Sequence, residues 1–425
     1  MSLFTHDTEI YTASAPGRLD VMGGIADYSG SLLLQMPTKE FTSVEIQLRH
    51  DGLFQIESLL ADGDKKKFVC QYRDFDPATS DWASYVIGCF YMLEREKNIK
   101  VSGANIRVRS TVPLGKGVSS SASLEVAVMR ALCKMHDIRT HGYELPVLAQ
   151  KVENEVVGAA CGLMDQLAVY FGERKKLLPL QCQPCTVFEP LFIPAGIEFC
   201  GIDSGVRHAV GSSSYSDVRT AAFMGYTMIA THEGVSDCEL QKAKIDRNFQ
   251  QLPYSGYLAN IPVDRFNKRY LPILPETVSG EEFLNQYKIS LDHFTHVQPE
   301  KKYRLRACTS HPVLENFRVS RFQELMLLLN DYPLNENILS EMGKLMIASH
   351  ESYSNVGLGN AKTDEIVRRV TAAGPDSGLY GARVSGGGNG GTVAILCNSK
   401  AGLSNARAIR SDLEEFFGQS LHFFE

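Results

Sequence analysis

The sequence lacks several features that would place it in large classes of protein. No run of apolar residues approaches the roughly 18 that span a bilayer. Residues 1–10 carry acids without a basic segment and an apolar core, so we expect no signal peptide. Basic residues are not in excess, since 43 Lys and Arg stand against 49 Asp and Glu, for a net charge of −6. The charge therefore indicates neither a nucleic acid nor an anionic membrane as a partner.

Cysteine is sparse, with ten residues scattered through 425. This spread fits reduced thiols, and hence a cytoplasmic protein, better than a disulfide-bonded secreted domain. One Cys-x-x-Cys pair, Cys182 and Cys185, has no second pair or histidines at zinc spacing, and the residues after it predict a strand instead of the helix of a redox motif. We interpret both cysteines as small core residues near a turn.

What is present is ordinary globular composition, with 44% apolar and 22% charged residues in a chain long enough for two domains. Strand-like alternation and helical spacing follow one another without a regular βαβ series, which predicts an α+β architecture. We place the domain change near residue 205, giving domains 1–205 and 206–425. Within the first domain the pattern predicts a strand hairpin over 41–48 and 53–59, helices over 82–93, 124–135 and 144–157, and a strand over 105–112.

Residues 112–127, V-P-L-G-K-G-V-S-S-S-A-S-L-E-V-A, carry the strongest functional signal. A strand ends at Pro113, small residues form a tight loop, and an amphipathic helix begins within the serines. Gly115 and Gly117 let the backbone approach an anion, and the serines stand beside the unpaired amides of a helix N-terminus. The loop is not a Walker motif, because Lys116 is followed by glycine. An ordinary serine N-cap would explain one serine but not the run, so we expect an anion site.

Residues 385–391, S-G-G-G-N-G-G, form a second loop with five glycines in seven residues. Gly386, Gly388 and Gly391 match the dinucleotide pattern G-x-G-x-x-G, but residues 392–396 predict a strand where that pattern needs a helix. We reject the dinucleotide interpretation. The loop indicates either a backbone that packs closely against another segment or a tight strand connection.

Two further segments carry charged residues whose role the local pattern leaves open. Glu153 lies twelve residues before Asp165 of C-G-L-M-D-Q, and a helix end with a short turn between them lets both carboxylates reach one cleft. One could bind a metal and the other orient a hydroxyl, although acids on helix faces are usually solvated. Arg18 and Asp27 lie in A-P-G-R-L-D-V-M-G-G-I-A-D-Y-S-G, where a structural role is as plausible as a functional one.

Taken in order, these segments resemble the GHMP small-molecule kinases, which include galactokinase, homoserine kinase and mevalonate kinase. The A-P-G-R segment, the P-x-G-x-G-x-S-S-S-A loop and the C-terminal glycine loop match the three family motifs. C-G-L-M-D-Q and D-S-G-V-R-H-A-V-G-S-S-S-Y (203–215) are similar to the galactokinase-like sugar kinases, and the wording of 13–32, 115–123 and 380–393 is closest to the L-arabinokinases. Plant members carry a further N-terminal domain, which we expect to be absent here.

The resemblance implies a two-domain GHMP kinase fold with the active site in the cleft between the domains, and ATP with Mg²⁺ as cofactors. Asp165 matches the catalytic aspartate and Arg18 the arginine beside it, while Ser121 and Glu153 match the Mg²⁺ ligands. The triphosphate loop matches Gly115, Lys116, Gly117, Val118, Ser119, Ser120 and Ser121. The substrate site matches Asp27, Tyr215, Gly24, Ile25 and Gly162. Asp165 would orient the anomeric hydroxyl of a sugar for attack on the γ-phosphate.

One departure from the family bears on the sugar. Galactokinases have G-E-H-T-D-Y where this chain has Gly23-Gly24-Ile25-Ala26-Asp27-Tyr28, and their Glu and His hold the 6-hydroxyl of galactose. L-Arabinopyranose matches galactose in ring stereochemistry but lacks the hydroxymethyl group. Glycine and isoleucine at these positions favour L-arabinose, to be converted to L-arabinose 1-phosphate. We also expect that Gly24→Glu with Ile25→His would narrow the preference for L-arabinose over D-galactose, if the backbone there matches galactokinase.

Alternative functions remain open at the level of sequence. A galactokinase or another sugar-1-kinase would share these motifs. A non-catalytic sugar sensor on the kinase fold tends to lose the loop serines or the catalytic acid, both of which are kept here. The homoserine or mevalonate kinase branch lacks the 203–215 segment. Oligomeric state, the adenine contacts and the role of residues 253–310 are not predicted.

Overall fold

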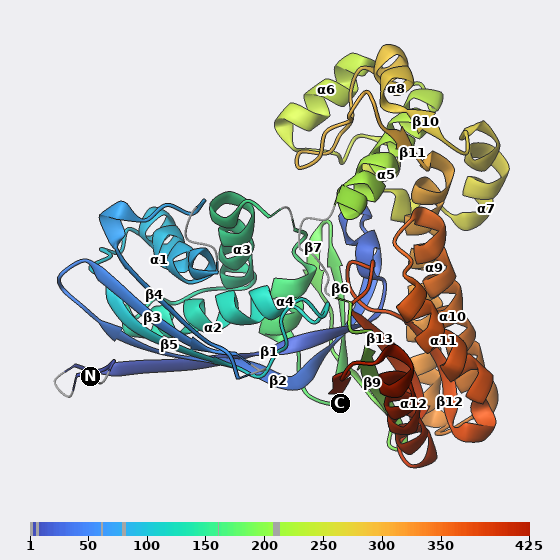
Figure 1. Ribbon diagram of the computed structural model, residues 1–425. Helices are drawn as coiled ribbons and strands as arrows, with labels where there is room; N and C mark the ends of the chain where they lie inside the picture. The colour runs from blue at the N-terminus through green and yellow to red at the C-terminus, as the bar shows by residue number, and fades with distance from the viewer. Residues whose placement is uncertain (1–2, 6–7, 61–62, 79–81, 160, 207–212) are drawn as a thin grey trace. The chain divides into compact units, whose positions relative to one another are not determined.

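A computed structural model describes residues 3–5, 8–60, 63–78, 82–159, 161–206 and 213–425 (Figure 1). The chain folds as two compact units. The first comprises Met1–Leu19, Met36–Arg174 and Phe424–Glu425, and the second comprises Asp20–Gln35 and Lys175–Phe423. These units divide the chain differently from the family-domain boundary at 205, which stays a prediction, because residues 20–35 and 175–205 fall in the second unit.

The first unit is built on a sheet whose central strands run in the order β4-β3-β5-β2. Its strands are β1 (Ile10–Met22), β2 (Leu32–Leu48), β3 (Leu53–Leu59), β4 (Lys65–Gln71) and β5 (Ala104–Ser110). β3 pairs parallel with β5 and antiparallel with β4, and β5 pairs antiparallel with residues 42–48 of β2. β1 and β2 each continue past the edge of the unit, so their other ends belong to the second.

The predicted hairpin of 41–48 with 53–59 is wrong, although both segments are strands. β5 lies between them, and β3 forms its hairpin with β4 instead. The alternation of buried residues fixes a strand and its inward face, but it carries no information about which neighbour supplies the hydrogen bonds. Here a parallel neighbour from about fifty residues further along the chain takes that edge.

Helices cover one face of this sheet (Figure 1). They are α1 (Ala83–Lys97), α2 (Ser120–Met135), α3 (Glu144–Lys151) and α4 (Met164–Phe171), with a π-helical turn at Val152–Val157 after α3. The predicted helices at 82–93, 124–135 and 144–157 are confirmed in type and place, and Gly158 ends the third in the left-handed conformation. Strand residues such as Ile46, Phe54 and Ile106 pack against helix residues such as Phe90 and Leu132 in one buried core.

The second unit contains three strands in the order β12-β13-β9, and both of their pairings are antiparallel. It also contains the strands β6 and β7, which follow β2 in the strand order of the larger sheet. Its strands are β6 (Lys176–Cys182), β7 (Cys185–Val187), β8 (Leu191–Phe192), β9 (Ile197–Asp203), β10 (Val278–Ser279), β11 (Lys302–Tyr303), β12 (Leu379–Val384) and β13 (Thr392–Asn398), and β14 (Phe423–Phe424) ends the chain. The strand after the glycine loop is β13, which confirms the rejection of a dinucleotide motif.

Helices of three to 27 residues make up much of the second unit. They are α5 (Ser213–His232), α6 (Asp237–Asp246), α7 (Val263–Arg265), α8 (Gly280–Tyr287), α9 (Leu305–Asp331), α10 (Glu336–Val356), α11 (Ala361–Ala373) and α12 (Ala401–Phe417). α10 and α11 pack on β12, and α12 packs on β13. Residues 253–273, for which no role was predicted, form short 3₁₀- and π-helical turns around α7.

The cysteines behave as the composition indicates. No disulfide joins any two of the ten, all of which lie in the described part of the chain. Cys182 and Cys185 face each other in the register of the β6–β7 pair, on either side of a tight turn. Among the described residues, no group of three or more His, Cys, Asp and Glu is arranged to hold a metal, and no helix has the length and apolar character to cross a membrane.

Candidate functional site

The loop at 115–121 has the backbone of an anion cradle. Gly115 and Gly117 have φ of 68° and 70°, and Ser119 is also left-handed with φ of 60°. The turn is followed directly by α2, which begins at Ser120, so the helix starts within the serine run as expected. The Ser119 side chain caps no amide, and its buried Oγ has no hydrogen-bond partner among the described residues. Free amides of the first helical turn and an unpartnered hydroxyl suit a phosphate.

The A-P-G-R segment contacts the loop at 115–121 and holds it in place. Arg18 donates its backbone N–H to the carbonyl of Val118 at 3.0 Å and its Nη1 to the carbonyl of Gly117 at 2.6 Å. A Cβ at Gly17 would lie 2.9 Å from the Val118 carbonyl oxygen, so only glycine fits beneath the loop. Val118 itself packs with Val112 and Phe424. The loop is therefore held by one arginine and by a close backbone approach.

The same arginine holds Asp165, in the first turn of α4. Its Nε and Nη2 both donate to Oδ1 of Asp165, at 3.0 and 2.8 Å. The arginine side chain is 4% exposed, whereas that of Asp165 is 30% exposed. No hydrogen bond within the described part of the chain reaches Oδ2, so this oxygen remains available to a substrate hydroxyl. Gly162, in the loop before α4, lies three residues away.

Glu153 lies on the π-helical turn and is 3% exposed. It accepts a hydrogen bond from Nε2 of Gln166 at 2.9 Å, and the Ser121 hydroxyl near it favours its ionised form. Burial, together with the negative charge of Asp165, raises the pKa of Glu153 to about 7. Ser121, Glu153 and Asp165, expected from the resemblance to serve one site, therefore lie in one cluster of the first unit.

The structure adds two residues to this cluster that the sequence did not single out. Glu125 is fully buried on α2, and Nε2 of Gln166 lies 3.3 Å from its Oε2. Burial and the charge of Glu153 raise the pKa of Glu125 well above its usual range. Its Oε1 and the Oε1 of Gln166 have no partner among the described residues. The one available signal was spacing, because Glu125 follows Ser121 by one helical turn and Gln166 is next to Asp165.

These donors fit a magnesium ion of the substrate-bound kind. The Ser121 hydroxyl and the Glu153 carboxylate are hard oxygen ligands that lie near each other. Mg²⁺ usually takes one or two carboxylates and completes its shell with water and substrate phosphates, so it needs no all-protein cage. That agrees with the lack of a three-ligand cluster among the described residues.

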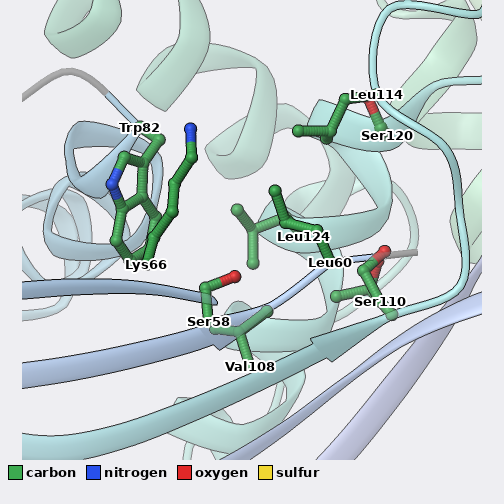
Figure 2. A pocket seen from close by; sticks show the side chains of 10 residues that line it. Ser58, Leu60, Lys66, Trp82, Val108, Ser110, Leu114, Ser120 and Leu124 are labelled. Atoms are coloured by element: carbon green, nitrogen blue, oxygen red, sulfur yellow. The ribbon is translucent and has the colours of Figure 1, made fainter. Parts of the chain in front are cut away.

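An apolar pocket adjoins the phosphate loop (Figure 2). Trp82 and Lys66 stand on one side of it, Leu114 and Ser120 on another, and Leu124 between them. Thr42, Ser58, Leu60, Val108 and Ser110 complete the lining. Trp82 is the single tryptophan of the chain. No motif marks this pocket, because its residues come from several strands and from the ends of α1 and α2, so the sequence analysis missed it.

Of the residues expected to bind sugar, Gly24, Ile25, Asp27 and Tyr215 lie in the second unit, and Gly162 lies in the first. Gly24, Ile25 and Asp27 belong to a buried 3₁₀ turn, Gly24–Ser29. The backbone N–H of Tyr28 donates to Oδ1 of Asp27 at 2.8 Å. The ring of Tyr28 meets that of Tyr215, on α5, edge to face at 6.2 Å. Asp27 and Tyr215 therefore flank the same tyrosine. Residues 207–212 of the predicted sugar-kinase segment 203–215 lie outside the described residues.

A buried ion pair stands behind this turn. Asp20 and Arg383, both fully buried, are joined by a contact of 3.0 Å from Nη1 to Oδ2. Asp20 also accepts hydrogen bonds from the backbone of Gly24 and of Gly386, in the second glycine loop. A Cβ at Gly388 would lie 2.7 Å from Cβ of Leu358. The expectation that this loop packs closely against another segment is confirmed.

Comparisons with known proteins agree with this geometry. Residues 84–173 match the model described as GHMP kinases N terminal domain, and residues 322–418 match GHMP kinases C terminal. The chain is 36% identical to an L-arabinokinase of Arabidopsis thaliana over 93% of its own length and 43% of that protein, so it spans less than half of that relative. It is 28% identical to a galactokinase of Chloroflexus aggregans, over 91% of this chain and 84% of the other.

Among solved structures, a Lactococcus lactis galactokinase complexed with galactose is similar with a TM-score of 0.72 at 22% identity, covering 99% of this chain and 94% of that one. A Methanococcus jannaschii mevalonate kinase matches with a TM-score of 0.58 at 15% identity, over 99% and 98%. At these identities the likeness concerns the fold, and it agrees with the α+β architecture expected from the sequence.

Proposed function

The chain belongs to the GHMP kinases, and we propose that it is an ATP-dependent sugar kinase that phosphorylates the anomeric hydroxyl of L-arabinose. The observation that carries the proposal is the position of Arg18. One buried side chain donates to the carbonyl of Gly117, in the phosphate loop, and to Oδ1 of Asp165. The arginine thereby fixes a partly exposed carboxylate relative to an anion cradle.

This arrangement suits phosphoryl transfer, which depends mostly on positioning and on stabilising charge. We assign the triphosphate to the loop at 115–121, where backbone amides and the Ser119 hydroxyl can donate hydrogen bonds to phosphate oxygens. We assign the adenine to the pocket beside it, where Trp82 and Leu124 offer apolar surface (Figure 2). An aromatic side chain and aliphatic neighbours suit a flat heterocycle.

Asp165 is the proposed base. Its Oδ1 is occupied by Arg18, and Oδ2 would accept the hydrogen bond of the anomeric hydroxyl. As the sugar oxygen forms its bond to the γ-phosphorus, its proton passes to Oδ2, and the bond from the γ-phosphorus to the bridging oxygen of ADP breaks. The products are sugar 1-phosphate, ADP and the released proton. Arg18 keeps the carboxylate oriented during this step.

We propose that Ser121 and Glu153 hold the Mg²⁺ that accompanies ATP. When bound, the ion neutralises charge on the phosphates. Gln166 donates to Glu153 and so orients that carboxylate, while the buried Glu125 supports Gln166 in turn. Supporting groups of this kind fix the ligands of a metal site.

The proposal of L-arabinose as the sugar rests on Gly24 and Ile25 and on the relative named L-arabinokinase. Asp27 and Tyr215 would contact ring hydroxyls that L-arabinose and D-galactose share. Gly24 and Ile25 offer no polar side chain for the extra hydroxymethyl group of a hexose. D-Galactose is the second candidate, since relatives named galactokinase match more than nine tenths of the chain. A cytoplasmic location stays a prediction.

The test is product formation by the purified chain. ATP, MgCl₂ and each of a panel of free pentoses and hexoses are mixed with the protein, ADP release is followed, and the product is identified by ³¹P NMR. We expect L-arabinose 1-phosphate, and no sugar-dependent ADP release from the Asp165→Asn variant prepared in parallel. Sugar-independent ATP hydrolysis alone, or phosphate on another hydroxyl, would contradict the proposal.

A further inference from the structure

Position 24 has no room for a side chain. Gly24 has φ of 45°, and a Cβ built on it would lie 1.6 Å from Oη of Tyr353 and 2.8 Å from its Cζ. The same Cβ would lie 2.9 Å from Nη2 of Arg383. Real Cβ atoms essentially never come within 3.0 Å of such neighbours. Any residue larger than glycine therefore requires Tyr353 to move.

Tyr353 is held firmly where it stands. It lies on α10 with its side chain fully buried. Its hydroxyl donates to the carbonyl of Gly386 at 2.9 Å and accepts the backbone N–H of Ile25 at 2.9 Å. The guanidinium of Arg383 lies over its ring at 5.2 Å, and that arginine is fixed by its buried pair with Asp20. Moving the hydroxyl would leave buried polar groups of two loops without partners.

Tyr353 thus does two things at the sugar turn. Its hydroxyl fills the space in which a side chain at position 24 would begin, and its hydrogen bond sets the backbone of Ile25. Both effects act on the two positions where this chain departs from the Glu-His pair of galactokinases. Tyr353 does not itself reach solvent, so its effect on a ligand passes through residues 24 and 25.

We propose that Tyr353 is a positioning residue for sugar specificity, acting as the partner of Gly24 that keeps an acidic side chain out of the pocket. This inference rests on the proposed function, since it concerns the sugar site of that reaction. It changes the expectation for the galactokinase-like swap. Gly24→Glu with Ile25→His cannot restore a hexose pocket while Tyr353 stays, and the swap requires Tyr353→Leu as a third change, because leucine lacks both the hydroxyl and Cζ.

The contact itself is tested without any substrate, by a double-mutant cycle on thermal stability. Gly24→Ala is made in the wild-type chain and in the Tyr353→Leu background. We expect Gly24→Ala to lower the Tm of the wild-type chain and to lose on the order of half or more of that effect when Tyr353→Leu is present. Equal Tm losses in the two backgrounds would overturn the proposal, because the alanine would then not be meeting Tyr353.

The effect on specificity is tested by kcat/KM for L-arabinose and D-galactose. We expect Gly24→Glu/Ile25→His to lose activity on both sugars, and the triple variant with Tyr353→Leu to lower the arabinose-to-galactose ratio roughly tenfold or more relative to the wild type. A double variant that lowers the ratio as far as the triple one would overturn the proposal. If the wild-type chain phosphorylates neither sugar, the proposed function fails, while the Tm cycle still decides the Gly24–Tyr353 contact.

A conservative variant covers the case in which the larger changes do not fold. Tyr353→Phe keeps the ring and removes the hydroxyl, and we expect it to raise the KM for L-arabinose roughly tenfold while the KM for ATP is unchanged. Tyr226→Phe is the matched control, since Tyr226 is another buried tyrosine of this unit whose hydroxyl donates to a backbone carbonyl, that of Pro253 at 2.7 Å. Equal kinetic effects of the two variants, or an unchanged KM for L-arabinose in Tyr353→Phe, would mean that Tyr353 only stabilises the core. Either result would overturn the inference.

Discussion

Arg18 donates two hydrogen bonds to a single oxygen of Asp165, from Nε at 3.0 Å and from Nη2 at 2.8 Å. A fork that binds both carboxylate oxygens would occupy an acceptor position on each of them. The one-oxygen contact fixes the direction of the carboxylate and keeps its second oxygen available. A third donor, Nη1, reaches the phosphate loop at Gly117, so one side chain relates the proposed base to the proposed phosphate site.

Asp165→Asn should abolish most turnover and leave the fold intact. The amide keeps the size of the side chain but cannot take a proton, so we expect kcat to fall on the order of 10²–10⁴-fold. Nucleotide affinity, measured by the fluorescence of Trp82, and the Tm should stay near their wild-type values. Near-normal turnover in the purified variant would mean that another group receives the proton.

Ser121→Ala and Glu153→Gln should each raise the concentration of Mg²⁺ needed for half-maximal activity. Both changes remove an oxygen ligand from a hard cation. The measurement is initial rate against free Mg²⁺ at saturating ATP and sugar. Glu155→Gln is the matched control, because Glu155 lies on the same π-helical turn but is exposed and paired with Arg95. If both test variants behave like the control, the metal is bound elsewhere.

Trp82→Ala should weaken ATP without affecting the sugar. Stacking of a base on an aromatic ring contributes about 1–3 kcal/mol, so we expect the KM for ATP to rise by roughly 5-fold to 150-fold. Since Trp82 is the only tryptophan, its fluorescence in the wild-type chain should change on titration with ATP. Tyr91→Ala, at an exposed position of the same helix, is the control. No change in Trp82 fluorescence on titration with ATP would place the adenine outside this pocket.

The contribution of His311 to the stability of the chain should rise with pH between about 4 and 6.5, whereas the raised pKa values of the buried Glu125 and Glu153 act in the opposite direction. Burial, helped by the charges of Arg318 and Arg383, lowers the pKa of His311 to about 4. In that interval the unfolded state binds a proton at His311 that the folded state does not, so this histidine makes unfolding harder as pH rises, by up to about 3 kcal/mol over the interval.

Thermal unfolding midpoints across this pH range test the assignment. His311→Gln should remove this contribution, so that the Tm rises less, or falls more, with pH than in the wild type, whereas His296→Gln, at an exposed histidine, should leave the dependence as in the wild type. A slope that His311→Gln does not change would assign the acid sensitivity to other groups.

The sequence predicts much of this molecule, and its failures have physical causes. Helices such as α2 follow from the spacing of residues that share one inward face, and their ends follow from Ser119 and Gly158. The pairing of β3 could not be predicted, because its neighbour β5 is remote in the chain. α9 begins at Leu305, although Pro312 and polar residues weaken the helical signal of its first half.

The candidate site divides in the same way. Residues that belong to contiguous segments, such as Arg18, Ser121 and Asp165, could be named because those segments resemble the motifs of the family. Trp82, Glu125 and Tyr353 could not, because each is an ordinary helical or helix-cap residue until its neighbours are known. The crowding of Gly24 by Tyr353 joins positions more than three hundred residues apart, and only the folded chain shows it.

The most direct test of the account is a competition in one tube. Equal concentrations of L-arabinose and D-galactose are given to the purified wild-type chain with limiting ATP and Mg²⁺, and the two sugar 1-phosphates are counted by ³¹P NMR, so that their ratio equals the ratio of specificity constants. An apolar site rejects an added hydroxyl by about 10²-fold at best, so we predict L-arabinose 1-phosphate in clear excess with D-galactose 1-phosphate detectable. Equal amounts, or an excess of D-galactose 1-phosphate, would contradict the sugar assignment.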